Sequence, residues 1–159
     1  MELHQIPLAQ IQPSQFYLSA QKLEAVRRWF SPEDLSGFDP VPVRVLCGEV
    51  IFTDGHTRAF AAYQAGLERI PLVWDDTHQD WEAYRLCVAA CRQRGIRQIA
   101  HLGDRILPME EYRQRWNGWC DVLFEVLELQ RATREHKQAA EALRGLLPLF
   151  WLQMKLVCC

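Results

Sequence analysis

The chain has 159 residues, of which 49% are hydrophobic, and 20 acidic residues against 18 lysines and arginines give a formal charge of −2. This length and hydrophobic content suffice for one domain with its own core, or for one domain with a helical extension. A chain without excess positive charge lacks the field that attracts nucleic acid irrespective of sequence, so DNA binding is disfavoured, although a local basic patch stays open.

The amino-terminal residues predict a cytoplasmic protein. Residues 1–5 lack the charged start and the long apolar run of a secretory signal. The six cysteines are therefore expected as reduced thiols, and their scatter matches no small disulfide scaffold. Cys87 and Cys91, one helical turn apart, fit either a pair buried on an apolar stripe or two ligands of a metal. The lack of a CxxC pair favours burial.

The first third of the chain predicts an edge strand, a helix and a hairpin. Apolar residues separated by prolines over residues 6–13 are typical of an edge strand followed by a turn. Ser19 precedes a helical pattern that ends at Ser31. Residues 41–46 alternate between apolar and polar and lead, through a tight connection, into a second strand over residues 49–53.

An apolar β-type run turns into an alanine-rich helical pattern at Asp54-Gly55. The first amides of a helix have no intrahelical partner, and Gly55 lacks the Cβ that would block an approaching oxygen, so this turn is a natural phosphate site. Arg58 adds a guanidinium suited to phosphate, and His56 can donate, accept or shuttle a proton. The alternative is structural: Asp54 caps the amide of Thr57, and the other side chains are solvated.

A strand over residues 70–74 follows the helix of this turn, and two adjacent carboxylates, Asp75 and Asp76, follow the strand. A strand, a crossover helix and a strand of this length can make a right-handed unit with a site beyond the strand's carboxyl end. The two aspartates could hold Mg²⁺ together with substrate phosphates. The alternative is a loop whose Asp80 caps the helix predicted over residues 81–94.

The carboxy-terminal third predicts helices. Pro108, followed by two glutamates, opens a long helix, and beyond Arg131 a charged linker leads to an Ala/Leu-rich helix that Pro148 interrupts. The apolar tail at residues 149–152 is too short and too broken to span a bilayer, which needs about 20 apolar residues. We expect no transmembrane segment, and we expect the tail to pack on its own domain or on a second subunit, so that the C-terminal helices could form a homodimer.

Three motifs resemble the core of the ParB N-terminal domain and sulfiredoxin superfamily: Pro40-Val41-Pro42-Val43, Asp54-Gly55-His56-Thr57-Arg58-Ala59 and Ile70-Pro71-Leu72-Val73. Members of this superfamily share a strand, a Gly-x-x-Arg turn, a helix and an Ile-Pro strand. The resemblance implies an α/β (α+β) fold with a small mixed sheet and surrounding helices over residues 1–107, as a domain of nucleotide-binding type. A C-terminal helical extension would cover residues 108–159.

In that superfamily the turn binds the phosphates of a nucleotide: ATP in sulfiredoxin, CTP in ParB proteins and ADP in an archaeal free-serine kinase. The resemblance therefore implies that Gly55, His56, Thr57 and Arg58 cradle the phosphates of ATP or ADP, or of CTP, with Mg²⁺. Sulfiredoxin has its catalytic cysteine where this chain has His56, so sulfinate reduction is not expected. ParB proteins have Gly-Glu-Arg-Arg at the turn, where this chain has Gly55-His56-Thr57-Arg58. Within the superfamily, the chain resembles bacterial members and the free-serine kinase branch.

These features lead to two functional hypotheses. The first is phosphoryl transfer from a nucleotide to a small hydroxyl-bearing molecule, with His56 or Asp54 activating the hydroxyl and the helix amino terminus stabilising the transferring group. The second is a non-enzymatic ParB-like module, DNA-associated or regulatory. A basic surface with salt-dependent DNA affinity would distinguish the second from the first.

Overall fold

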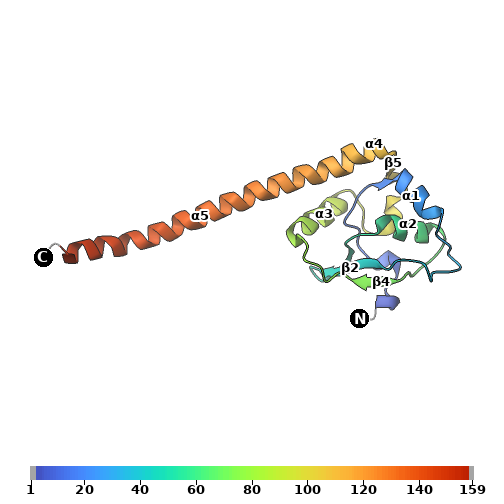
Figure 1. Cartoon of the computed structure of the whole chain (residues 1–159), viewed down its shortest axis with the longest axis horizontal. Coiled ribbons are helices and arrows are strands. Elements are labelled where there is room, and N and C mark those ends of the chain that lie inside the picture. Colours follow the sequence, from blue (N-terminus) through green and yellow to red (C-terminus); the bar gives the residue numbers. More distant parts are fainter. Residues whose placement is uncertain (1–2, 158–159) are drawn as a thin grey trace. The chain divides into compact units, whose positions relative to one another are not determined.

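The structure is a computed structural model that describes residues 3–157, with side chains described for residue 3 and residues 5–145 (Figure 1). It divides into two compact units, Met1–Cys120 and Asp121–Cys159. The first unit combines helices with small sheets, so the predicted mixed α/β class is confirmed. This unit extends past residue 107 because Tyr112 is buried and Trp116 and Trp119 pack against the core.

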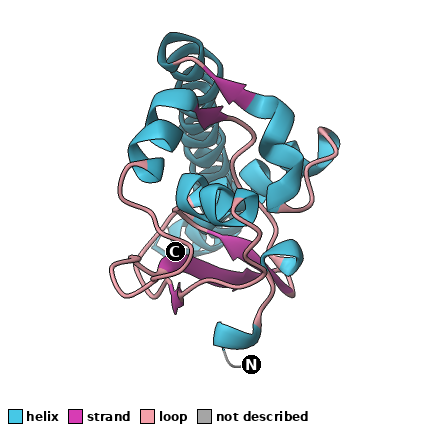
Figure 2. Ribbon diagram, turned by 90° about the vertical axis from the view of Figure 1, so that its right-hand side faces the viewer, coloured by secondary structure: helices cyan, strands magenta, loops and turns pink. Residues whose placement is uncertain are grey.

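The larger sheet has three strands in the order β3-β2-β4. Figure 2 shows the strands of both sheets in magenta. Its central strand β2 (Val41–Leu46) pairs antiparallel with β3 (Glu49–Phe52) and parallel with β4 (Leu72–Trp74). The hairpin predicted from the alternating pattern is confirmed. The right-handed strand–helix–strand unit is wrong, because β3 and β4 run in opposite directions on the two sides of β2. A second, two-stranded sheet pairs β1 (Leu18–Ser19) with β5 (Ile106–Leu107) in parallel.

Three helices of the first unit begin and end near the predicted residues: α1 (Ala20–Arg27), α2 (His56–Gln64) and α3 (Trp81–Gln93). The side chains of Ser19 and Asp80 accept hydrogen bonds from the backbone amide three residues on, at 3.3 and 3.2 Å, and so cap α1 and α3. The capping interpretation of Asp80 is therefore confirmed.

The core gathers around α2, which packs against α1 and against β2 (Figures 1 and 2). Alternation in β2 turns its apolar residues toward this core, except that Val45 is exposed. The largest side chains with almost no exposure are Phe16, Phe52, Phe60, Ile11, Leu18, Leu23, Ile51, Ile96, Ile99 and Leu102. They come from every part of the first unit, so the turn at the start of α2 is held by contacts distant in sequence.

The predicted amino-terminal edge strand is wrong. The segment instead forms two short 3₁₀ helices, η1 (Leu3–Gln5) and η2 (Leu8–Gln10). In the described part of the segment, β-type pairing with the larger sheet is limited to an isolated bridge between Gln12 and Ile51. Proline has no amide to give to a strand ladder, and Pro7 precedes η2 with an extended backbone. The segment therefore follows the sheet edge without pairing along it.

The helices after α3 are η3 (Ile99–Arg105, 3₁₀), α4 (Met109–Tyr112), the π-helical η4 (Arg113–Asn117) and α5 (Gly118–Val157). The long helix predicted to open at Pro108 is confirmed.

The predicted charged linker and the interruption at Pro148 are wrong, because α5 continues through both. Proline removes one intrahelical hydrogen bond and its ring crowds the carbonyl four residues before it, which weakens the helix, but the backbone stays helical through Pro148. None of the described helices combines the length and apolar character needed to cross a bilayer. The side chains at residues 149–152, expected to pack on the domain or on a second subunit, lie outside the described ones.

Candidate functional site

The turn between β3 and α2 needs glycine at position 55. Gly55 is the N-cap residue of α2 and has φ 72° and ψ 16°, in the left-handed region. A Cβ built on it would lie 3.1 Å from the side chain of Val41 and 3.1 Å from Nη2 of Arg58. Both the backbone conformation and the packing therefore disfavour a larger residue, as the Asp-Gly sequence indicated.

The amino terminus of α2 has no side-chain cap, unlike those of α1 and α3. The alternative in which Asp54 caps the amide of Thr57 is therefore wrong: Gly55 is the N-cap, and Asp54 is exposed. Amides in the first turn of α2 lie at the positive end of the helix dipole without a side-chain acceptor. This arrangement favours an anion at the turn.

Arg58 folds back over the turn. Its Nη1 donates to the backbone carbonyl of Asp39 at 2.9 Å and lies 3.8 Å from the Asp39 carboxylate. The arginine side chain is 20% exposed, whereas that of Asp39 is 88% exposed, so water screens this ion pair. A guanidinium has five donors, and the carbonyl uses one of them. The carbonyl therefore does not satisfy the guanidinium by itself.

His56 lies in the interior with 3% of its surface exposed, beside the ring of Phe52. Its Nε2 accepts a hydrogen bond from the backbone amide of Ser14 at 3.0 Å, so the proton of the neutral ring is on Nδ1. Burial lowers the pKa of His56 to about 4, against the opposing charge of Asp54. The imidazole is therefore neutral at pH 7, and it ties the turn to the Ser14 loop rather than facing solvent.

Two tyrosine hydroxyls form hydrogen bonds with the segments next to the turn. Tyr84 of α3 donates through its hydroxyl to the carbonyl of Thr53 at 2.8 Å, and the Tyr112 hydroxyl lies 3.1 Å from Nε2 of Gln15. Burial raises the pKa of both tyrosines to about 12, so both keep their protons at physiological pH. Sequence analysis missed them because they come from helices distant along the chain.

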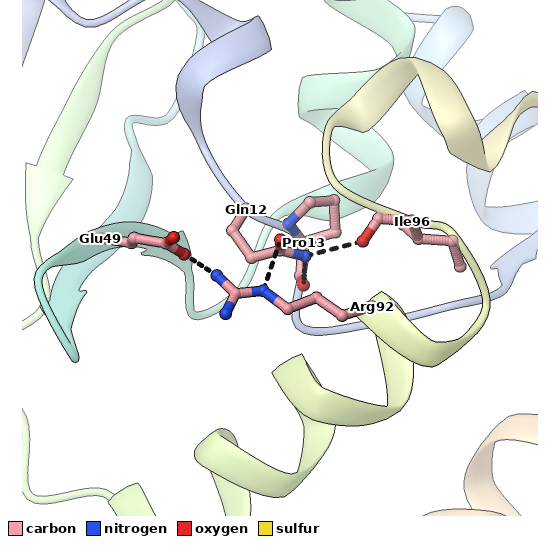
Figure 3. A network of polar contacts seen from close by, with 5 residues as sticks. All are labelled: Gln12, Pro13, Glu49, Arg92 and Ile96. Atoms are coloured by element: carbon pink, nitrogen blue, oxygen red, sulfur yellow. Dashed lines mark hydrogen bonds and ion pairs between the residues drawn. The ribbon is translucent and has the colours of Figure 1, made fainter.

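A buried glutamine fixes the loop that meets His56 (Figure 3). Nε2 of Gln12 donates to the carbonyls of Pro13 and Ile96 at 2.8 and 3.0 Å, and its Oε1 accepts from Nε of Arg92 at 3.3 Å. Arg92 in turn pairs with Glu49. This network joins the loop to α3 and β3, and no pattern in the sequence singled out Gln12.

The structure separates the two aspartates predicted to bind Mg²⁺. Asp75 is buried, and its Oδ1 accepts hydrogen bonds from the backbone amide of Thr77, at 3.0 Å, and from the Thr77 hydroxyl, whereas Asp76 is exposed. Burial works to raise the pKa of Asp75, but these hydrogen bonds and the charge of Arg44 hold it below its usual value. Among the described residues no three His, Cys, Asp or Glu side chains come together as a metal site.

The cysteine pair of α3 has the environment expected of buried thiols. Cys91 is fully buried and Cys87 is partly buried. Burial raises the pKa of each to about 12, with neighbouring thiols adding to the effect. Both are therefore protonated at pH 7.

Comparisons with known proteins leave the family open. No family model matches the chain, and neither does any curated protein. The fold has a weak likeness to the crystal structure of protein Atu1540 from Agrobacterium tumefaciens, with a TM-score of 0.35 and 18% identity over 57% of this chain. The match spans 46% of that protein's chain. Function must therefore be inferred from the site itself.

Proposed function

We propose that this chain is a ParB/sulfiredoxin-like protein that binds the phosphates of a nucleotide at the amino terminus of α2. The observation behind this proposal is the uncapped first turn of α2, entered through a left-handed Gly55 and followed by Arg58. Amide donors without side-chain partners, a positive dipole end and a guanidinium in one turn form an arrangement that favours phosphate oxygens.

The proposed reaction is phosphoryl transfer to a small hydroxyl-bearing molecule, with ATP or ADP, or CTP, as the donor. The first amides of α2, together with Thr57 and Arg58, would hold the phosphates and stabilise the charge of the transferring group. Asp54 is the better base for the acceptor hydroxyl because its side chain is exposed at the turn. His56 would position the turn, because its Nε2 already accepts the Ser14 amide.

Magnesium would enter as its complex with the nucleotide. Mg²⁺ commonly takes one or two carboxylates in addition to phosphate oxygens. Asp76 has an exposed carboxylate for this purpose, whereas Asp75 is already hydrogen bonded to Thr77. Replacing Asp76 by Asn should weaken binding of the magnesium nucleotide and leave binding of the metal-free nucleotide unchanged.

A thermal-shift panel tests the proposed ligand. ATP, ADP and CTP, with and without Mg²⁺, should raise the unfolding midpoint, since a ligand at about 100 times its Kd stabilises by about 2.7 kcal/mol. Arg58→Ala should abolish the rise. Arg69→Ala is the matched control, because Arg69 is half exposed and lies outside the turn. A rise that adenosine alone reproduces, or that survives Arg58→Ala, contradicts phosphate binding at α2.

We further propose that α5 forms a homodimer with a second copy of the chain. Val122, Val126 and Leu129 follow one another at spacings of four and three residues and are 57%, 44% and 69% exposed. Leu143, 64% exposed, falls in the same register two heptads beyond Leu129, with Thr133, His136 and Ala140 at the positions between. A 4-3 repeat of exposed apolar side chains is typical of a coiled-coil seam. Leu129→Glu should dissociate the dimer in analytical ultracentrifugation, and Gln138→Glu, outside the stripe, should not.

A further inference from the structure

Three arginines from separate segments line a hollow of about 440 Å³ in the first unit. Arg94 ends α3, Arg105 ends η3 and Arg115 lies in η4. The hollow shares no lining residue with the turn at α2. Its volume falls in the range of small-molecule sites, which are commonly about 300–1,000 Å³.

Aromatic rings hold the three guanidinium groups in place. Arg94 lies over the ring of Phe16 at 4.2 Å, and Arg105 and Arg115 lie over the ring of Tyr17 at 5.8 and 4.5 Å. Arg115 also donates to the hydroxyl of Tyr17. Guanidinium groups stacked on rings keep their edges, which carry the N–H donors, available to a ligand.

The positive charge of the hollow is not balanced. Its lining holds three arginines and one acid, Asp104, which leaves a formal charge of +2. Among side chains that the structure describes, neither Arg94 nor Arg105 has a carboxylate within ion-pair distance. Arg115 lies 4.0 Å from Glu111, an exposed pair of little strength. Like charges gathered without counter-charges repel one another, and a bound anion would relieve that repulsion.

Capping of α3 explains only part of this arrangement. Nη1 of Arg94 donates to the carbonyl of Ala90 at 2.9 Å, and Nη2 of Arg105 donates to the carbonyl of Arg94 at 3.3 Å. Cations favour the carboxyl end of a helix for this reason. A carbonyl is a neutral dipole, however, and each contact uses one of five donors. Most of the donors and the formal charge of +2 remain for a ligand.

We infer that this hollow binds the phosphate group of a small molecule. Three arginines that line one hollow suit a compact, multiply charged group such as a phosphate or diphosphate. Recognition of a nucleic-acid backbone would need basic side chains spread along the chain surface, and the formal charge of −2 gives no such field. The site is independent of the turn at α2, and either site can exist without the other.

Isothermal titration with inorganic pyrophosphate at physiological salt tests the inference on the full chain. Arg94→Gln, Arg105→Gln and Arg115→Gln should each weaken binding at least about tenfold, the value of one charge-assisted hydrogen bond. Arg97→Gln removes the same charge from an exposed residue outside the lining and should leave the Kd unchanged. Circular dichroism of each variant checks folding. If the loss of the Arg94 contact to Phe16 unfolds the chain, the affinities of Arg105→Gln and Arg115→Gln for pyrophosphate test the inference.

Four results would overturn the inference. Pyrophosphate that does not bind at millimolar concentration excludes the site. If Arg97→Gln weakens pyrophosphate binding as much as the three hollow variants do, binding depends only on the net charge of the protein. Binding that Arg58→Gln abolishes and the three hollow variants retain places the phosphate at α2 instead. A short duplex DNA that binds more tightly than pyrophosphate, with the same three variants affected, makes the hollow a nucleic-acid surface.

Discussion

The turn at α2 and the arginine-lined hollow both offer groups that suit phosphate, but they are built in opposite ways. The turn is contiguous in sequence, and its donors are backbone amides held by a buried His56 and a left-handed Gly55. The hollow is lined by three exposed or half-buried side chains from separate segments: Arg94, Arg105 and Arg115. The turn therefore belongs to the folded core, whereas the hollow is a surface addition to it.

This difference separates stability from binding. Substitutions at the turn should cost folding free energy because they disturb buried packing and a required backbone conformation. Substitutions in the hollow should cost binding alone, because its side chains bury little. Four predictions test this separation, beginning with the largest expected effect.

Removing the imidazole of His56 should have the largest effect on stability. His56→Ala leaves a cavity beside Phe52 and an unpaired Ser14 amide, and we expect the free energy of unfolding to fall by about 3–4 kcal/mol in urea titrations. His78→Ala, at an exposed loop residue, should change it by less than about 0.5 kcal/mol. Equal effects of the two variants would mean that His56 does not anchor the turn.

Acidification should destabilise the chain through the same residue. The pKa of His56 is about 4 in the folded chain, against 6.5 for an unperturbed imidazole. Between these two pH values the unfolded chain binds a proton at His56 and the folded chain does not. The contribution of the neutral His56 to the free energy of unfolding is therefore fully present above pH 6.5. The free energy of unfolding falls by about 3 kcal/mol as the pH drops to about 4. Urea titrations across this range should show the loss. His56→Gln keeps an acceptor for Ser14 and should flatten the slope, and an unchanged slope would contradict the assignment.

A side chain at the turn should cost less than loss of the imidazole. Gly55→Ala forces a left-handed backbone on alanine and presses Cβ against Val41, and we expect a loss of about 1–3 kcal/mol. Gly37→Ala is the matched control because nothing lies within 4 Å of its added Cβ. It should be neutral or slightly stabilising. Thermal unfolding that shows Gly55→Ala to be as stable as Gly37→Ala would contradict the description of the turn.

The smallest change in stability is expected in the hollow. Without added phosphate, Arg105→Gln should leave the free energy of unfolding unchanged to within about 0.5 kcal/mol, because it removes a charge that has no described carboxylate partner. Chemical denaturation with and without pyrophosphate measures both states. A loss above about 1 kcal/mol in the absence of phosphate would instead assign Arg105 a structural role.

Local signals in the sequence predicted local structure. Ser19 and Asp80 marked helix starts, Gly55 marked the turn, and the alternating residues 41–46 marked a strand of a hairpin, because caps, turns and alternation act within a few residues. Contacts between distant segments were beyond such signals. The position of β4 beside β2 is one of them.

The same limit applies to the candidate site. The sequence indicated the turn from Gly55 to Arg58, but we interpreted His56 as a group that meets substrate. In the structure His56 is buried and bonded to the amide of Ser14, which lies 42 residues away along the chain. The gathering of Arg94, Arg105 and Arg115 likewise arises only when three segments fold together. Side chains that come together only through tertiary contacts have no regular spacing along the sequence, so a single sequence does not predict their contacts.

The most direct test of phosphate binding at α2 is an amide NMR titration of the full chain with ATP and Mg²⁺. Saturable shifts should appear at the amides of Thr57 and Arg58, the donors proposed to meet the phosphates, and Arg58→Ala should reduce them. Adenosine at the same concentration should not move them. A titration in which these amides stay still while the chain remains folded, or in which only Gly95 and Arg105 respond, would contradict the account.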